Sequence, residues 1–172
     1  SFPLDHRIST CGFRFEEKPV LPNLIAEKLK EYNIPIRARQ AIKEGADFIT
    51  HDGRVIPNSE LIINNHTART FAFCSDTRYN ESYVDSVRNA DLLYHEATFA
   101  SDNQALAQTT YHSTGADAAR IALKAEAGKL IIGHFSARYK DHTTILKEAT
   151  AIFQNTEAIS EGQVFLVDAK NQ

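Results

Sequence analysis

The stretch STGADAARIALKAEAGKLIIGH, residues 113–134, decides the fold because it places a helix directly before a strand. Thr114 and Asp117 have the spacing of a capping box, which marks the start of a helix. The apolar residues that follow recur at helical spacing and form the expected buried stripe: Ala118, Ile121, Ala122 and Ala125. Gly128 is expected to end this helix as its C′ residue. The next apolar run predicts a buried strand, which leads straight into His134.

Strands and helices alternate on both sides of this stretch. Strands are expected in residues 1–10, 11–18, 69–76, 91–99 and 163–169, and helices in residues 22–33, 37–44, 80–87 and 143–153. Asp52-Gly53 lies between two β-rich runs and predicts a hairpin. The sequence therefore predicts an α/β or α+β fold in which helices cover the sheets.

Composition narrows the class of protein. The chain has 172 residues, which is the length of one domain with a sizeable core. It has no apolar run near the roughly 20 residues that a membrane helix needs, and its first residues lack the pattern of a signal peptide. The net charge of −3 disfavours strong attraction of the whole domain to nucleic acid, although a local basic patch stays open. Cys11 and Cys74 are expected to be reduced core residues of a cytoplasmic protein.

Several apolar runs end in a residue that can bind a metal or transfer a proton: His6, Asp76, His95, Glu96 and His134. His112 stands just before the capped helix. Ligands bind beside the carboxyl ends of strands in layered α/β folds, so these side chains are candidates for one shared site. A single histidine at a strand end is more often structural, and H-x-H, H-E-x-x-H and C-x-x-C are all absent. Taken alone, the pattern indicates only a possible His/Asp metal site.

Five motifs occur in order along the chain: FPLDHRISTCGFRFEEK, CSDT, DLLYHEATF, YHST and LIIGHFSARY. Together they resemble the C-terminal half of ribonuclease Z, the tRNA 3′-processing endonuclease family of the metallo-β-lactamase superfamily. The resemblance covers essentially the whole chain and is greatest to the version in Bacteroides-type bacteria. It implies an αββα sandwich, of which this chain supplies mainly the C-terminal β-sheet and its helices.

The resemblance also implies roles for individual residues. His6 would bind one zinc ion, His134 would bind the other, and Asp76 would bridge both. His112 matches the histidine that assists proton transfer at the leaving oxygen. Glu96 is expected to support catalysis by orienting a histidine.

Three further residues near these motifs have less specific expectations. His95 is expected to pack structurally, because neighbouring residues of a strand face opposite sides. Ser136 and Arg138 could shape the pocket or contact a phosphate, and surface or packing roles are equally consistent with the sequence.

The implied function is a zinc-dependent endoribonuclease that removes the 3′ trailer from precursor tRNA by two-metal phosphodiester hydrolysis. The complete active site would hold two zinc ions, with manganese as a possible alternative. The resemblance further implies a cytoplasmic homodimer that binds precursor tRNA and does not associate with a membrane.

The principal metal motif of the family, H-x-H-x-D-H, does not occur in the chain. The chain also contains no methionine and opens abruptly in a predicted strand, so an N-terminal portion that carries this motif is expected to be missing. The three implied ligands would give each metal about two protein ligands, whereas catalytic zinc normally has three. We therefore expect the chain alone to bind zinc poorly and to be inactive.

Residues of about 18–66 correspond to the region where many family members carry a protruding tRNA-binding arm with a Gly-Pro signature. Gly-Pro is absent here, so we expect a reduced arm within a single domain that spans 1–172. Arg37, Arg39 and Lys43 could bind phosphates, but a solvated helix face fits the pattern equally well.

Two other functions stay open at this point. The protein could be a metallo-β-lactamase-fold hydrolase of a small ester or phosphodiester. It could also be a non-catalytic half-domain that binds RNA or serves a structural role. The joint presence of all four candidate residues, His6, Asp76, His112 and His134, disfavours the second alternative, because such a module has no physical need of them.

Overall fold

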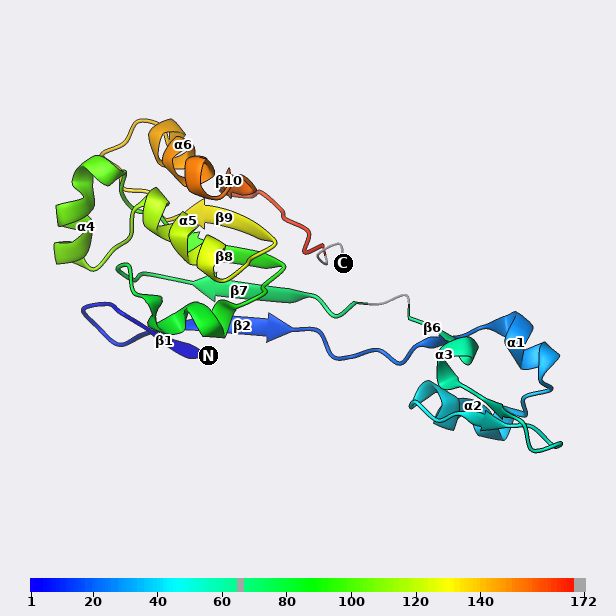
Figure 1. Ribbon diagram of the computed structural model, residues 1–172. Helices are drawn as coiled ribbons and strands as arrows, with labels where there is room; N and C mark the ends of the chain where they lie inside the picture. Colours follow the sequence, from blue (N-terminus) through cyan, green and yellow to red (C-terminus); the bar gives the residue numbers. More distant parts are fainter. Residues whose placement is uncertain (65–66, 169–172) are drawn as a thin grey trace. The chain divides into compact units, whose positions relative to one another are not determined.

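The computed structural model describes residues 1–64 and 67–168. The chain forms two compact units (Figure 1). The first unit consists of residues 1–17 together with the chain from residue 69 onward, and the second consists of residues 18–68. The second unit thus begins and ends close to the region of 18–66 in which the sequence predicted a reduced arm. Each unit has a core of its own.

A mixed six-stranded sheet forms the centre of the first unit, in the order β1-β2-β7-β8-β9-β10. Its strands are β1 (Phe2–Leu4), β2 (Thr10–Glu16), β7 (Thr70–Cys74), β8 (Leu92–Glu96), β9 (Lys129–Gly133) and β10 (Thr156–Ala158). The last four strands of this order run parallel to one another, whereas β1 and β2 are antiparallel to their neighbours. The carboxyl ends of β7, β8 and β9 therefore meet at one edge of the sheet, where the candidate site residues follow.

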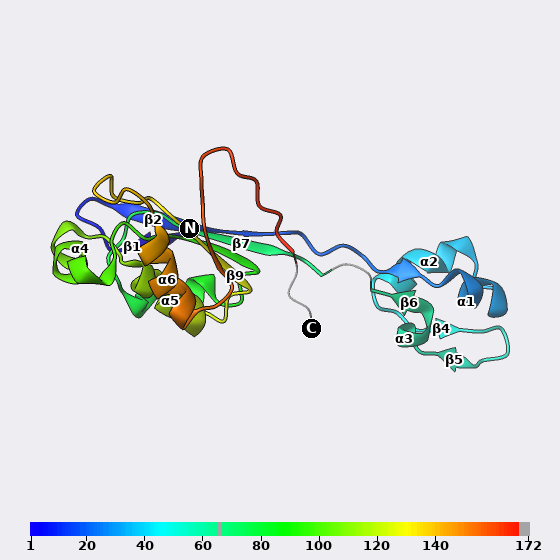
Figure 2. The same cartoon turned by 90° about the horizontal axis from the view of Figure 1, so that it is seen from above.

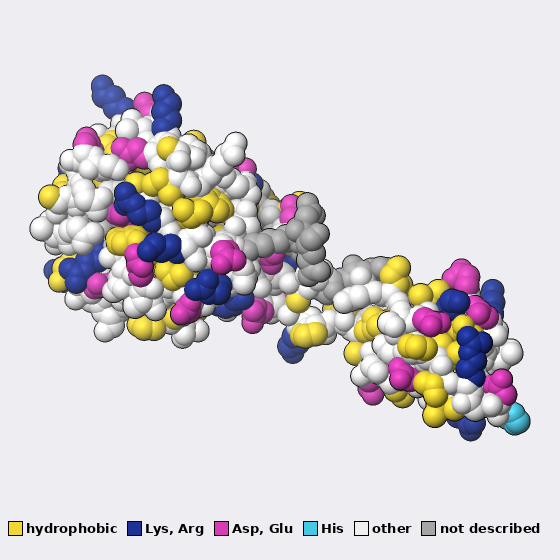
Figure 3. Space-filling model, viewed as in Figure 1, with side chains coloured by type: hydrophobic (Ala, Val, Ile, Leu, Met, Phe, Trp, Pro, Cys, Tyr) yellow, Lys and Arg dark blue, Asp and Glu magenta, His cyan; other side chains and the backbone are white. Residues whose placement is uncertain are grey.

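Helices cover one face of this sheet, as the two views in Figures 1 and 2 show. They are the 3₁₀ helix η1 (Glu81–Val87), α5 (Gly115–Lys124) and α6 (Thr143–Ile152); η2 (Ser101–Asn103) and α4 (Gln104–Thr110) lie before α5 in the chain. The capping box of Thr114 and Asp117 is present at the start of α5, as predicted. Basic and acidic side chains are interspersed on the face of the unit seen in Figure 3.

The core of the first unit lies between this helical layer and the sheet. Its fully buried aliphatic residues come from strands and helices alike: Leu93, Leu130, Ile132, Ile121 and Ile145. Gly115 permits the close approach of α5 to α6, because a Cβ atom there would lie 2.5 Å from the carbonyl oxygen of Ile145. This packing fixes α5, and with it the segment before α5, against the sheet.

The opposite face of the sheet carries rows of aromatic side chains. Phe13 and Phe15 of β2 stand opposite Phe73 and Phe71 of β7, and Phe73 stacks on Tyr94 of β8 with ring centroids 4.6 Å apart. Phe13 and Phe15 are 43% and 56% exposed. These five residues are called the aromatic face below. An exposed apolar surface of this kind is typical of a face that packs against another segment or another protein.

The second unit is small and contains short elements. Its helices are α1 (Ala26–Glu31), α2 (Ile36–Lys43) and α3 (Asn58–Leu61), and its strands are β3 (Asn23–Leu24), β4 (Phe48–Ile49), β5 (Val55–Ile56) and β6 (Ile62–Ile63). β3 pairs with β6, and β4 pairs with β5 across the predicted Asp52-Gly53 hairpin. Gly53 has a φ of +84°, which explains the glycine at this turn. Ile34, Ile42, Ile56 and Leu61 form the buried core.

Some expectations for individual elements were wrong. The run at 163–168 is not a strand, and residue 169 lies outside the described residues; the last strand is instead β10, which pairs with β9. Glu126, with a φ of 53°, takes the left-handed position after α5 that was expected for Gly128. Cys74 is buried as predicted, but Cys11 is exposed, because it lies on the same side of β2 as Phe13, on the face of the sheet opposite to the helices η1, α5 and α6 (Figure 1).

Helix α4 was not predicted. Within the two described ranges, the structure holds no helix that is long and apolar enough to cross a membrane.

Candidate metal centre

The segments that follow β7, β8 and β9 bring three candidate residues together. Asp76 follows β7, His134 follows β9 directly, and His112 lies between α4 and α5. One possible ligand atom from each of these residues lies within 4.8 Å of the others. The Nε2 atom of His134 is 3.6 Å from Oδ1 of Asp76. A carboxylate and two imidazoles at this separation are a donor set that suits a divalent metal ion.

His134 reaches this position through an unusual backbone conformation. Its φ is 61°, in the left-handed region that residues with a Cβ atom seldom adopt. The preceding Gly133 is packed against Ile159 and Tyr94, so strand β9 is held up to its last residue. The chain then turns sharply, which sets the imidazole beside Asp76 instead of continuing the strand. Such strain is often found at functional sites.

His6 lies next to the three residues, in the loop between β1 and β2. Its ring centroid is 5.3 Å from that of His112, which in turn stacks on His134 at 5.3 Å. Nδ1 of His6 is 2.9 Å from the carbonyl oxygen of Tyr111. Since a carbonyl can only accept a hydrogen bond, Nδ1 of His6 carries the proton and Nε2 is free to bind a metal.

Glu96 is fully buried beneath these histidines. Its carboxylate accepts hydrogen bonds from the backbone N–H of Thr77 at 3.1 Å, from the backbone N–H of Thr98 at 3.0 Å and from Nδ1 of His112 at 2.9 Å. Burial raises the pKa of Glu96, but the hydrogen bond from His112 and the charges of His95 and His112 outweigh it and lower the pKa. The same hydrogen bond raises the pKa of His112, against the opposing effect of burial. Glu96 is therefore a carboxylate that orients His112.

His95 points away from the site and into the core. It is fully buried, with Nε2 2.8 Å from the hydroxyl of Tyr83 and Nδ1 2.6 Å from the carbonyl oxygen of Glu96. Burial lowers the pKa of His95. The alternation along β8 thus separates a structural histidine from the neighbouring carboxylate, in the way the sequence predicted.

Ser136 and Arg138 lie beside the segment that follows β8. The backbone N–H of Ser136 donates to the carbonyl oxygen of Thr98 at 3.0 Å, and Nε of Arg138 donates to the hydroxyl of Ser136 at 3.2 Å. The guanidinium of Arg138 lies 5.2 Å from the ring centroid of Phe99. Both residues therefore have packing contacts near the candidate metal ligands, and the side chain of Arg138 is exposed to solvent.

Two contributors to the site were not among the predicted residues. The hydroxyl of Thr98 lies within 3.3 Å of atoms of Glu96, His112 and His134. A signal for Thr98 existed, because it follows Glu96 by two residues and so faces the same side of an extended segment. Tyr111 contributes through its carbonyl group, for which the side-chain pattern gives no signal.

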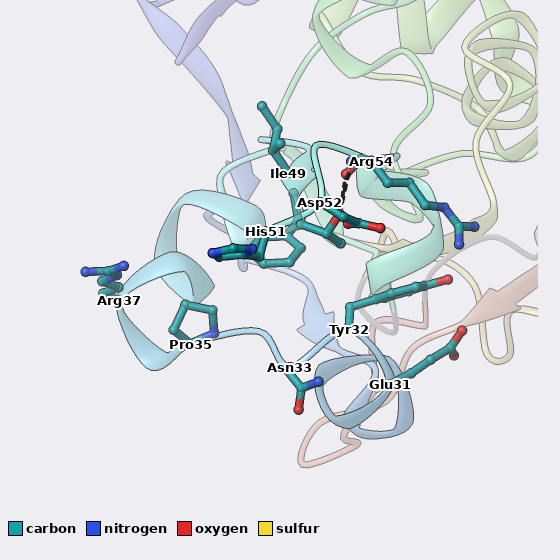
Figure 4. A pocket seen from close by; sticks show the side chains of 11 residues that line it. Glu31, Tyr32, Asn33, Pro35, Arg37, Ile49, His51, Asp52 and Arg54 are labelled. Carbon is teal, nitrogen blue, oxygen red and sulfur yellow. Dashed lines mark hydrogen bonds between the residues drawn. The ribbon is translucent and has the colours of Figure 1, made fainter.

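The second unit has an open pocket of about 580 Å³, shown in Figure 4. Its lining includes Tyr32, Arg37 and Arg54 as well as the acidic Glu31 and Asp52. The guanidinium of Arg54 lies 5.8 Å from the ring centroid of Tyr32. An aromatic ring with nearby cationic groups is a combination that nucleic-acid-binding surfaces use, although the two carboxylates here reduce the positive potential.

Comparison with known sequences gives a consistent assignment. No protein-family model matches the chain. It is 46% identical over 168 residues to the Ribonuclease Z of Bacteroides thetaiotaomicron, a match that covers 98% of this chain and 53% of that protein. The Ribonuclease Z of Parabacteroides distasonis is 46% identical over 162 residues, which cover 94% of this chain and 53% of that protein. The chain therefore spans about half the length of the curated relatives it matches.

Comparison with solved structures agrees with the predicted fold class. The metallo-β-lactamase fold protein YhfI from Bacillus subtilis matches with a TM-score of 0.50 and 29% identity, over 58% of this chain and 39% of that one. The mixed α/β architecture with one helix-covered sheet is accordingly part of a metallo-β-lactamase fold. Over about half of their length, the Ribonuclease Z proteins are thus similar to essentially the whole of this chain.

Proposed function

We propose that the natural protein containing this chain is a metal-dependent endoribonuclease that removes the 3′ trailer from precursor tRNA. One observation carries the proposal: Asp76, His112 and His134 converge beside the buried Glu96, in a chain 46% identical to a Ribonuclease Z. A metal site of this composition is suited to the hydrolysis of a phosphodiester bond, such as the one that is cleaved in precursor tRNA.

The metal ligands would be His6 for one zinc ion, His134 for the other and Asp76 for both. Imidazole and carboxylate donors suit zinc, and manganese accepts the same set. When two such ions are bound, they supply Lewis acidity at the scissile phosphate. The free Nε2 of His6 and the short separation of Asp76 from His134 support this assignment.

His112 would act on the leaving group. Its Nδ1 is hydrogen-bonded to Glu96, so Nε2 is the nitrogen that can donate a proton to the departing ribose 3′-oxygen. The hydrogen bond to Glu96 raises the pKa of His112, so the imidazole more readily holds the proton that it would donate. The products would be tRNA with a free 3′-OH and a trailer with a 5′-phosphate. Ser136 and Arg138 would contact the phosphates that flank the cleavage site.

We further propose that the active site is completed by a segment that this chain does not contain. The relatives are about twice as long, and Asp76, His6 and His134 alone are too few ligands for two catalytic metal ions. That segment would carry H-x-H-x-D-H and would pack against the aromatic face. The chain alone would then be inactive.

The remaining proposals concern partners and location. Precursor tRNA would be the substrate and the functional form a homodimer, in the cytoplasm where precursor tRNA is made. The second unit would serve as a reduced arm, in which Tyr32, Arg37 and Arg54 line the pocket that touches the RNA. Arg39 is a weaker candidate for phosphate contact, because its Nε atom is buried.

The test begins with the coding sequence upstream of Ser1, where H-x-H-x-D-H is expected. The complete protein is then assayed on a precursor tRNA and on bis(p-nitrophenyl) phosphate, with and without chelator. Release of the trailer that is lost with chelator and restored by zinc supports the proposal. Hydrolysis of the small diester alone would identify a general hydrolase, and RNA binding without hydrolysis would identify a non-catalytic module; either result overturns the proposed function.

A further inference from the structure

We infer that Thr98 is a positioning residue whose hydroxyl fixes the tautomer of the metal ligand His134 and joins that ligand to Glu96. The inference rests on the proposed metal site, and it adds a residue to which no role has been assigned above. It starts from the geometry of one oxygen atom. Oγ1 of Thr98 is 2.8 Å from Oε2 of Glu96, 3.0 Å from Nδ1 of His134 and 3.3 Å from Nδ1 of His112.

The first step concerns the direction of the bond to Glu96. The Glu96 carboxylate is fully buried and surrounded by donors from Thr77, Thr98 and His112. A carboxylate in such a setting is an acceptor only, so Thr98 must donate its hydroxyl proton to Oε2. The competing acceptor, a neutral imidazole nitrogen of His134, forms a weaker bond than a charged carboxylate does.

The second step follows from the single proton of a hydroxyl group. Because its only hydroxyl proton is used in the hydrogen bond to Glu96, the oxygen of Thr98 can only accept a hydrogen bond from Nδ1 of His134, which lies 3.0 Å away. Nδ1 of His134 must then carry a proton, and Nε2 must carry the lone pair. Nε2 is the atom that lies 3.6 Å from Asp76, on the side where the proposed metal would bind. Thr98 therefore presents the correct nitrogen of His134 to the metal.

The same reasoning connects the two halves of the proposed site. Oε1 of Glu96 accepts a hydrogen bond from Nδ1 of His112, and Oε2 accepts one from the hydroxyl of Thr98. The hydroxyl of Thr98 thus links the carboxylate that holds the proton donor to the histidine that holds the metal. Its backbone is also fixed, because the Thr98 N–H donates to Glu96 and the Thr98 carbonyl accepts from Ser136.

The test uses the natural polypeptide that contains this chain, in three variants. Thr98→Val removes the hydroxyl at nearly constant shape, and Thr98→Ser retains the hydroxyl. Thr156→Val is the matched control, because Thr156 is a buried threonine of β10 whose hydroxyl donates to the carbonyl oxygen of Phe153. Zinc affinity is measured by competition with a chromophoric chelator. We expect a loss of about 10- to 100-fold for Thr98→Val, and wild-type affinity for the serine variant and the control.

A second readout needs neither metal nor substrate. Imidazole ¹⁵N chemical shifts of the metal-free wild type, assigned with a His134→Asn variant, should show His134 as the Nδ1–H tautomer. Thr98→Val should move His134 towards the Nε2–H tautomer. An Nε2–H tautomer in the wild type would overturn the inference even if Thr98→Val does not fold, and so would unchanged zinc affinity in a folded Thr98→Val. Because neither readout involves RNA cleavage, failure of the proposed function would be recognised separately.

Discussion

Nδ1 of His112 lies 2.9 Å from Oε1 of Glu96, and this carboxylate is completely buried. Burial alone would favour the neutral acid, but the donors that converge on Glu96 hold it in the charged form. The pair thus consists of a charged carboxylate and a partly exposed imidazole whose second nitrogen is free to react. The effect of Glu96 on His112 can therefore be tested apart from metal binding when the site is saturated with zinc.

At a zinc concentration that saturates the variant as well as the wild type, Glu96→Gln should lower kcat/KM for precursor tRNA by about 10- to 100-fold. The amide keeps the shape of the side chain but cannot stabilise a protonated His112, so the proposed proton donor is weakened. Steady-state kinetics and metal analysis of the complete protein test this. Glu157→Gln is the control, because Glu157 pairs with Lys129 on the surface of the sheet. Equal activity of both variants would show that Glu96 does not assist His112.

His95 provides a prediction about pH and stability. Its folded-state pKa is lowered by burial, whereas the unfolded chain titrates near the ordinary value of about 6.5. Below that value the unfolded state binds more protons than the folded state. The contribution of His95 to the free energy of unfolding is therefore fully present above about pH 7 and weakens as the pH falls.

His95→Gln should remove this dependence. The difference in unfolding free energy between wild type and variant should shrink on going from pH 7 to pH 5, by at most about 1.4 kcal/mol per pH unit. Urea denaturation at several pH values measures it. A constant difference would mean that His95 keeps its ordinary pKa in the folded protein.

The start of helix α5 and the opposite orientations of His95 and Glu96 in β8 could be predicted, because each depends only on residues close in the sequence. Thr114 and Asp117 cap the helix from three positions apart, and His95 and Glu96 face opposite sides because a strand alternates. Local patterns of this kind are visible in the sequence itself.

The features that escaped prediction depend on distant parts of the chain. Residues 163–168 contain a continuous apolar run, as a buried strand does, yet Val164 and Leu166 are 83% and 79% exposed, because β10 already occupies the place beside β9. The central role of Thr98 arises only when the segments after β8 and β9 and before α5 meet. The motifs indicated that Asp76, His112 and His134 would lie close together, as they do, but not that the hydroxyl of Thr98 lies between Glu96, His112 and His134.

Asp76→Asn should lower zinc affinity at least about 10-fold and reduce cleavage of precursor tRNA to background. A neutral amide binds zinc more weakly than a carboxylate and cannot compensate the charge of two cations. Equilibrium dialysis and a cleavage assay on the complete protein test the expectation. Asp102→Asn, an exposed carboxylate of η2, is the matched control. Retention of both zinc and activity by Asp76→Asn would place the metal centre elsewhere.

The aromatic face allows a test of whether the chain is completed by another segment. Phe13 and Phe15 are partly exposed in this structure, and single substitutions of exposed residues usually change stability by less than about 0.5 kcal/mol. If the proposed segment covers this face in the complete protein, the same residues are buried there. Truncation of a buried phenylalanine costs about 3–5 kcal/mol.

Phe15→Ala should therefore destabilise the complete protein by several times more than it destabilises this chain expressed alone. Leu123→Ala is the control. Leu123 is 55% exposed, like Phe15, but it lies on α5, on the other side of the sheet from the aromatic face. Chemical denaturation of both proteins with both variants gives the four values that are needed. A small effect of Phe15→Ala in the complete protein would show that the aromatic face stays open to solvent. The missing ligands would then have to reach Asp76 and His134 by a route that leaves this side of the sheet uncovered.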